Sequence, residues 1–265
     1  MLYHARQQQI SIHGMPTDTI TFGKGTKPLI MIQGLNTRGI RGSALPLAWA
    51  YRLFAKEYQV FLFDRRPEVF DGITVRDLAG DVATAMDQLG IRNADVIGVS
   101  QGGMMAQYLA IDRHDLVRKL VLAVTLSRSN DTVTSVIEHW IALTRQGDMK
   151  QLVADMAEKM YSDGYIRRVR PFMPLLTALQ KPRDTQRFIA LAKACLTCGA
   201  YEELEKIRCP VFVIGGRQDR VVGSEASEEI ARKLGCSIFM YEQLGHAAYE
   251  EAKDFNQRIY DFLRE

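Results

Sequence analysis

Short apolar runs alternate along this chain with longer segments of helical periodicity, and this alternation restricts the fold more than any other feature. Residues 29–32 (Leu-Ile-Met-Ile) and 60–63 (Val-Phe-Leu-Phe) are typical of strands buried on both faces. Further strands are predicted at residues 8–12, 19–22, 95–99, 119–124, 210–214 and 237–241. Strand–helix–strand order requires crossover connections, so the pattern predicts a mostly parallel sheet with helices on its faces.

The helical segments have recognisable starts and ends. Thr74 with Asp77 resembles a capping box before a helix at residues 78–89. Gly14-Met15-Pro16 is interpreted as the turn between the first two strands. Other helices are predicted at residues 44–57, 102–111, 225–234 and 248–263. Between residues 133 and 199 only helical patterns occur, at 136–145, 149–161, 165–180 and 185–194, which indicates an insertion over the sheet.

Composition and charge exclude several classes of protein. The 265 residues are 47% hydrophobic and 25% charged, as in an ordinary globular chain and unlike collagen or disordered segments. The net charge of +3 is too small to favour a nucleic-acid or membrane partner. No apolar run has the length of a membrane span, and the N-terminal segment lacks the apolar region of a signal peptide. The expected location is therefore intracellular, in the cytoplasm.

The four cysteines are expected to be free thiols, because nothing in the chain indicates secretion. Cys195 and Cys198 form a C-x-x-C pair, but no second pair follows at zinc-ribbon spacing. The pair follows a helical run, whereas a redox pair would open a helix after a strand. Two buried thiols one helical turn apart are therefore predicted.

Gly98-Val99-Ser100-Gln101-Gly102 lies directly between a predicted strand and a predicted helix. This is the context in which G-x-S-x-G forms a nucleophile elbow, a sharp turn that presents the serine hydroxyl above the edge of the sheet. Glycines on either side leave room for the strained turn, and the N-terminus of the following helix favours negative charge nearby. Ser100 is therefore the predicted nucleophile.

A serine hydroxyl needs a base, and His246 is the histidine of the five that follows the last predicted strand. The carboxyl ends of parallel strands are where such folds gather their chemistry. Asp219 follows the neighbouring strand and is predicted to orient the imidazole, in the chain order Ser100, Asp219, His246. Asp131 and, less favoured, Asp64 are the alternative acids.

Two backbone N–H groups are expected to bind the oxyanion. Gln101 follows the nucleophile and supplies one; Leu35, with Asn36 as second choice, supplies the other from the loop after residues 29–32. Gly34 permits this loop to turn its amides inward.

With these motifs the chain resembles the α/β-hydrolase fold superfamily over essentially its whole length, and within it the small esterases and enol-lactone hydrolases that carry a cap. The resemblance implies an eight-stranded, mostly parallel sheet flanked by helices, with residues 1–126 and 202–265 as the core and residues 127–201 as an inserted helical cap. Two departures stand out. Gln33-Gly34 replaces the usual His-Gly, and Asp64-Arg65-Arg66-Pro67-Glu68 keeps the start of D-x-R-G-x-G without its glycines.

The sequence therefore predicts a serine hydrolase with a Ser100–His246–Asp219 triad, acting on a small-molecule carboxylic ester or lactone without metal or organic cofactor. The same triad also serves C–C bond hydrolases, amidases including aminopeptidases, and cofactor-free perhydrolases; a receptor-like binding protein is the non-enzymatic alternative.

In the predicted cap, Arg167, Arg168 and Arg170 are interpreted as a solvated helix face. Candidate lining or packing residues of the cap are Met156, Met160, Phe172, Met173, Leu175, Leu176 and Leu179.

Overall fold

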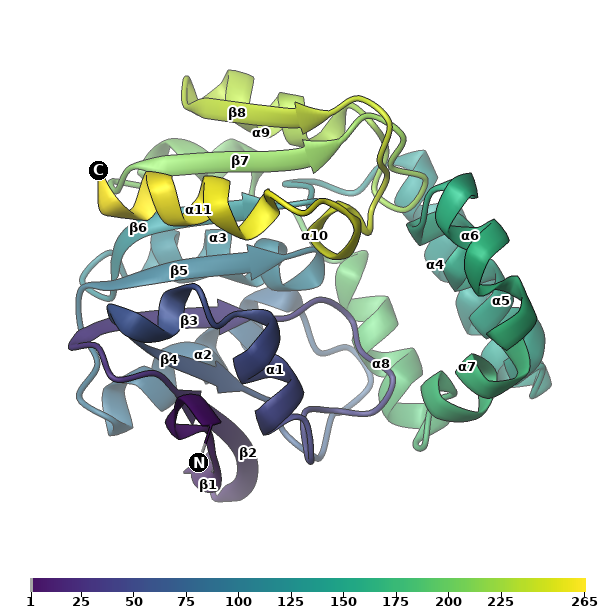
Figure 1. Ribbon diagram of the computed structural model, residues 1–265, viewed down its shortest axis with the longest axis horizontal. Coiled ribbons are helices and arrows are strands. Elements are labelled where there is room, and N and C mark those ends of the chain that lie inside the picture. The colour runs from purple at the N-terminus through teal and green to yellow at the C-terminus, as the bar shows by residue number, and fades with distance from the viewer. Residues whose placement is uncertain (1) are drawn as a thin grey trace.

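A computed structural model describes residues 2–265, and these form an eight-stranded sheet with helices on both faces (Figure 1). The spatial order of the strands is β1-β2-β4-β3-β5-β6-β7-β8. The two pairings of β2 are antiparallel and all the others are parallel, which confirms the predicted fold class. The strands are β1 (Arg6–Ile12), β2 (Met15–Phe22), β3 (Lys27–Ile32), β4 (Tyr58–Phe63), β5 (Ala94–Val99), β6 (Val117–Ala123), β7 (Val211–Gly216) and β8 (Ser237–Tyr241).

Helices cover both faces of the sheet and one end of it. The α-helices are α1 (Ala44–Ala50), α2 (Val75–Gln88), α3 (Gln101–Asp112), α4 (Asp131–Gln146), α5 (Met149–Met160), α6 (Asp163–Val169), α7 (Met173–Gln180), α8 (Thr185–Cys195), α9 (Ala226–Leu234), α10 (Ala248–Glu251) and α11 (Phe255–Arg264). Short 3₁₀ segments are η1 (Leu2–His4), η2 (Phe54–Lys56), η3 (Arg170–Phe172) and η4 (Tyr201–Lys206).

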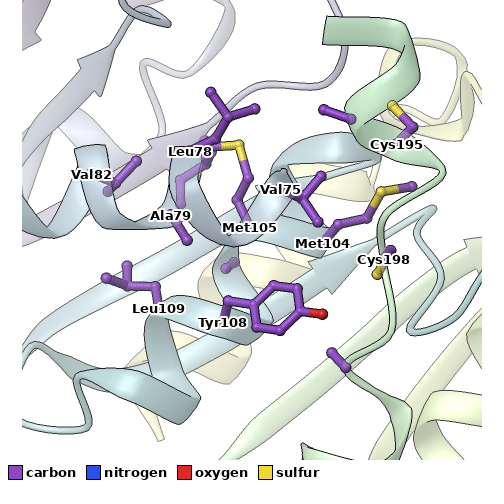
Figure 2. Close-up of a cluster of buried hydrophobic side chains, with 14 of the residues drawn as sticks. Val75, Leu78, Ala79, Val82, Met104, Met105, Tyr108, Leu109, Cys195 and Cys198 are labelled. Carbon is purple, nitrogen blue, oxygen red and sulfur yellow. The ribbon is translucent and has the colours of Figure 1, made fainter. Parts of the chain in front are cut away.

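Successive side chains of each strand point to opposite faces of the sheet, and each face carries one half of the core. Leu29 and Met31 of β3 join a buried cluster with α1 and α11, whereas Ile30 and Ile32 join a second cluster with α2 and α3. Figure 2 shows part of the second cluster, in which apolar side chains of α2 meet those of α3. Cys195 and Cys198 lie in this region and are free and buried, as predicted.

The α4–α8 segment lies beyond the carboxyl ends of the parallel strands, with α8 close to the sheet and α5–α7 farther out (Figure 1). This places several helices over the edge where the loops after β3, β5, β7 and β8 converge. None of the helices in residues 2–265 is long and apolar enough to cross a membrane.

The predicted boundaries of the first turn and of the first helix differ from the structure. The turn between β1 and β2 is His13-Gly14, both at positive φ (51° and 79°), so Met15 and Pro16 already belong to β2. The predicted helix at residues 44–57 ends at Ala50; the chain then re-forms as η2, where fully buried Phe54 packs against Tyr58. Burial of the Phe54 ring outweighs the preference of the local sequence for a continuous helix.

Two further predicted helices are interrupted. Residues 165–180 divide into α6, η3 and α7, because Pro171 and Pro174 lack the backbone N–H that a continuous helix needs. Residues 248–263 divide into α10 and α11 at Ala252, whose backbone is extended (φ −82°, ψ 120°). The start of α2 agrees with prediction, since Thr74 and Asp77 form a complete capping box.

Candidate active site

Ser100 lies on the sharp turn between β5 and α3, with φ 54° and ψ −121°. A positive φ is sparsely populated for a residue with a β-carbon, so the surroundings must hold this turn in place. A β-carbon at Gly98 would lie 2.5 Å from the Gly102 carbonyl oxygen, and one at Gly102 would lie 2.0 Å from that of Ile32. The turn therefore requires glycine on both sides of the serine.

The hydroxyl, the imidazole and the carboxylate form one hydrogen-bonded chain. Ser100 Oγ lies 2.9 Å from His246 Nε2, and His246 Nδ1 lies 2.8 Å from Asp219 Oδ2. A carboxylate only accepts, so Nδ1 carries the proton and Nε2 is free to accept from the hydroxyl. The structure thus brings together the three side chains predicted from the sequence, one from each of the loops after β5, β7 and β8.

Asp219 is held independently of the histidine. Its Oδ1 accepts hydrogen bonds from the backbone N–H groups of Val221 (2.8 Å) and Val222 (3.0 Å), which leaves Oδ2 for the imidazole. The side chains of Asp219 and His246 are only 3% and 4% exposed. The carboxylate therefore has one orientation, and it fixes the imidazole ring in turn.

The alternative acids lie elsewhere. Asp131 is exposed in the first turn of α4. Asp64 Oδ1 lies 3.5 Å from Arg187 Nη2, and this carboxylate also accepts from the N–H groups of Ile40 (3.0 Å) and Arg65 (2.7 Å). Of the three candidate carboxylates, Asp219 is the one hydrogen-bonded to His246.

The loop after β3 lies directly against Ser100. A β-carbon at Gly34 would lie 3.2 Å from Ser100 Cβ, so this glycine allows the loop to approach. Leu35 lines the same cavity as Ser100, and Gln101 is the first residue of α3, where N–H groups lack partners within the helix. The two residues predicted to bind an oxyanion therefore lie on either side of the serine.

A small apolar cavity of about 40 Å³ opens at Ser100 and His246. No lysine or arginine is among the described residues that line it. Trp140 has its indole N–H satisfied by Asp155 Oδ2 at 2.7 Å. The other lining residues are Gly34, Leu35, Met104, Val133, Ile137, Met156, Met160, Cys195, Val221, Val222 and Tyr249.

A second cavity of about 250 Å³ adjoins the first and shares Gly34, Leu35 and Tyr249 with it. Its other walls are mostly apolar, and β3, β5 and α11 supply the largest share of them. Glu250 lies at this cavity and accepts a hydrogen bond from Tyr161 Oη at 2.5 Å. Burial raises the pKa of this carboxyl group.

Sequence reasoning anticipated part of the cavity lining. Met156 and Met160 line it, whereas Phe172, Leu175 and Leu179 are exposed on the outer helices. The side chains of Met173 and Leu176 lie outside the described part of the structure. Missed residues include Val133, Ile137 and Trp140, whose spacing of four and three positions on α4 was a usable signal.

Comparison with known proteins gives the family. Residues 29–258 match the model of the alpha/beta hydrolase family, and the chain belongs to this family. It is 28% identical, over an alignment of 277 residues, to 2-hydroxymuconate semialdehyde hydrolase of Pseudomonas sp. (strain CF600), covering 97% of this chain and 94% of that protein. The homologues support hydrolase activity at the level of the family.

Two further comparisons limit which properties of known proteins can be applied to this chain. The crystal structure of the enol-lactonase from Burkholderia xenovorans LB400 has a TM-score of 0.84, with 21% identity over 97% of this chain and 100% of the other, which shows the fold. The dihydrolipoyllysine-residue acetyltransferase component of the acetoin cleaving system of Cupriavidus necator is 26% identical over 191 residues. That match covers 70% of this chain but only half the length of the relative.

Proposed function

We propose that this protein is a serine hydrolase that cleaves a small carboxylic ester or lactone through an acyl-enzyme. The observation that carries the proposal is the continuous chain of hydrogen bonds from Ser100 Oγ through His246 to Asp219. Its hydrogen-bond distances are short enough for proton transfer, and the side chains of His246 and Asp219 are buried.

The reaction follows from this arrangement. Ser100 Oγ attacks the substrate carbonyl while His246 Nε2 takes the hydroxyl proton, and the N–H groups of Leu35 and Gln101 bind the oxyanion. When the C–O bond breaks, the imidazolium returns the proton to the departing alkoxide, which leaves as an alcohol. A water molecule then attacks the acyl-enzyme while His246 Nε2 takes its proton. The imidazolium returns this proton to Ser100 Oγ as the acyl–Oγ bond breaks, and the carboxylic acid is released.

The cavity supports a small, uncharged acyl group. A substrate carboxylate buried in this cavity would need a cation, and the described lining offers neither lysine nor arginine. The adjoining cavity beyond Leu35 and Tyr249 is larger and is assigned to the leaving group. We further propose that residues 127–201 act as the cap that selects the acyl group, since α4 and α5 supply Trp140 and Met156 to the lining.

C–C bond hydrolysis is the second candidate. The observation that favours it is the similarity to 2-hydroxymuconate semialdehyde hydrolase over nearly the whole of both chains. The same nucleophile and base would act, so only the substrate distinguishes the two reactions. The absence of cations from the described cavity lining favours the ester.

The deciding experiment is hydrolysis of p-nitrophenyl esters of increasing acyl length by wild type and Ser100→Ala, together with labelling by a fluorophosphonate. Turnover and labelling that both depend on Ser100, with a preference for short acyl chains, are expected. Labelling without ester turnover would favour the C–C substrates. Neither labelling nor turnover would favour a binding protein on this fold.

A further inference from the structure

We propose that Arg65 is a positioning residue that aligns the two backbone donors of the oxyanion hole and places a buried positive charge behind them. The inference rests on the proposed serine-hydrolase function and extends it to a residue outside the triad. Arg65 occupies the second position of the segment in which this chain departs from the D-x-R-G-x-G pattern.

One nitrogen of Arg65 joins the two segments that carry the predicted donors. Nη2 donates to the Gln33 carbonyl oxygen (2.5 Å) and to Gln101 Oε1 (3.3 Å). Gln33 comes just before the Gly34-Leu35 peptide, while Gln101 carries the other predicted N–H on its own backbone. A single guanidinium therefore fixes the loop after β3 relative to the first residue of α3.

The side chain of Gln101 has no freedom to turn away from Arg65. It is 1% exposed, and its Nε2 donates to the Leu191 carbonyl oxygen (2.7 Å) and to Cys195 Sγ (3.2 Å). Both of these acceptors belong to α8, so Oε1 is left for the arginine. The contacts run from the loop after β4 through Gln101 to α8.

The charge of Arg65 lies in an unusual environment. The residue is 4% exposed, and both hydrogen bonds from Nη2 go to neutral oxygens. Its Nε has no hydrogen-bond partner among the described residues. The neighbouring carboxylate of Asp64 lies nearer Arg187, at 3.5 Å from its Nη2. A buried cation held in this way costs stability, which points to a role other than stability.

The guanidinium remains charged under working conditions. Burial lowers the pKa of Arg65 to about 10, which is still well above neutral pH. Negative charge that develops on the substrate oxygen next to Leu35 and Gln101 would interact with this cation across a water-poor interior. The interaction is strongest in the transition state, so it acts on kcat more than on KM.

Arg66 supplies the matched control. It is the next residue of the same loop and is also largely buried, but its Nε donates to Asp81 Oδ2 at 2.7 Å and its Nη2 to Asp81 Oδ1. These contacts tie the loop after β4 to α2, and none of them involves Gln33 or Gln101. A change at Arg66 tests stability without changing either contact of Arg65.

The experiment compares Arg65→Met, Arg65→Lys, Arg66→Lys and Ser100→Ala with wild type. Measured are kcat, KM, the fluorophosphonate labelling rate, the affinity for a trifluoromethyl ketone that forms an oxyanion on the serine, and Tm. Arg65→Met is expected to lower kcat, the labelling rate and ketone affinity by about 10–100-fold with KM within about two-fold. Arg65→Lys should give a kcat and a ketone affinity between those of Arg65→Met and wild type. Arg66→Lys should keep kcat within about two-fold of wild type.

Each outcome decides a different question. A folded Arg65→Met with wild-type kcat and ketone affinity would overturn the role of Arg65, as would an equal loss of kcat in Arg66→Lys. If Arg65→Met does not fold, Arg65→Lys decides, and unchanged kcat there overturns the inference. If wild-type turnover does not depend on Ser100, the proposed function fails and the inference on Arg65 fails with it.

Discussion

The backbone of Gly102 packs against the carbonyl group of Ile32, so that a β-carbon at position 102 would lie 2.0 Å from the Ile32 oxygen. Ile32 is the last residue of β3, and the predicted oxyanion loop begins immediately after it. Gly102 follows Ser100, the predicted nucleophile, by two positions and belongs to α3. This close approach therefore fixes the position of Ser100 relative to the loop that carries Leu35.

Gly102→Ala is expected to destabilise the protein and to abolish turnover. The clash is with backbone, which cannot rotate away, and the cost should be about 3 kcal/mol or more. Gly80 in α2 is the control, because it is exposed and a β-carbon there meets no described atom within 4 Å. Gly80→Ala should gain about 0.5–1 kcal/mol. Urea denaturation measures both; equal stability of the two variants would contradict the packing argument.

Asp219→Asn is expected to lower kcat by about 10³–10⁴-fold while the fold is retained. The amide oxygen can still accept from the N–H groups of Val221 and Val222. The amide NH₂ would then face His246 Nδ1, which favours the tautomer with its proton on Nε2, so the imidazole could not accept from Ser100. Steady-state kinetics and Tm of the variant check this. A kcat within ten-fold of wild type would remove Asp219 from the proposed triad.

Cys195 should remain unmodified by iodoacetamide in the native protein, although it lines the cavity at Ser100. Burial raises the pKa of its thiol to about 12, so the reactive thiolate is scarce at neutral pH. Mass spectrometry of peptides after labelling at pH 7.5 measures this, with unfolded protein as the control that labels at every cysteine. Rapid native labelling of Cys195 would contradict the burial of this thiol.

The sequence was sufficient to predict which side chains meet at the edge of the sheet. Ser100, Asp219 and His246 each follow a strand, and parallel strands bring such loops to one edge whatever the detailed packing. Thr74 and Asp77 were predictable for a similar reason, since a capping box is a local interaction.

Other features depend on contacts between distant segments and could not be predicted in this way. Phe54 leaves the helical period because its ring is buried against Tyr58 and Tyr260. Arg65 was visible only as one position in a segment that departs from the family pattern. Its burial depends on Gln33 and Gln101, which lie 32 and 36 positions away in the chain.

Met156→Ala is expected to enlarge the cavity at Ser100 and to shift preference toward longer acyl chains. Met156 is half-buried on α5 and lines that cavity, so its truncation adds space with a limited loss of packing. The ratio of kcat/KM for p-nitrophenyl hexanoate over acetate should rise by about ten-fold. Leu175→Ala on α7 is the control, because this side chain is 58% exposed and does not line the cavity. An unchanged ratio in Met156→Ala, or an equal shift in Leu175→Ala, would show that the acyl group binds elsewhere.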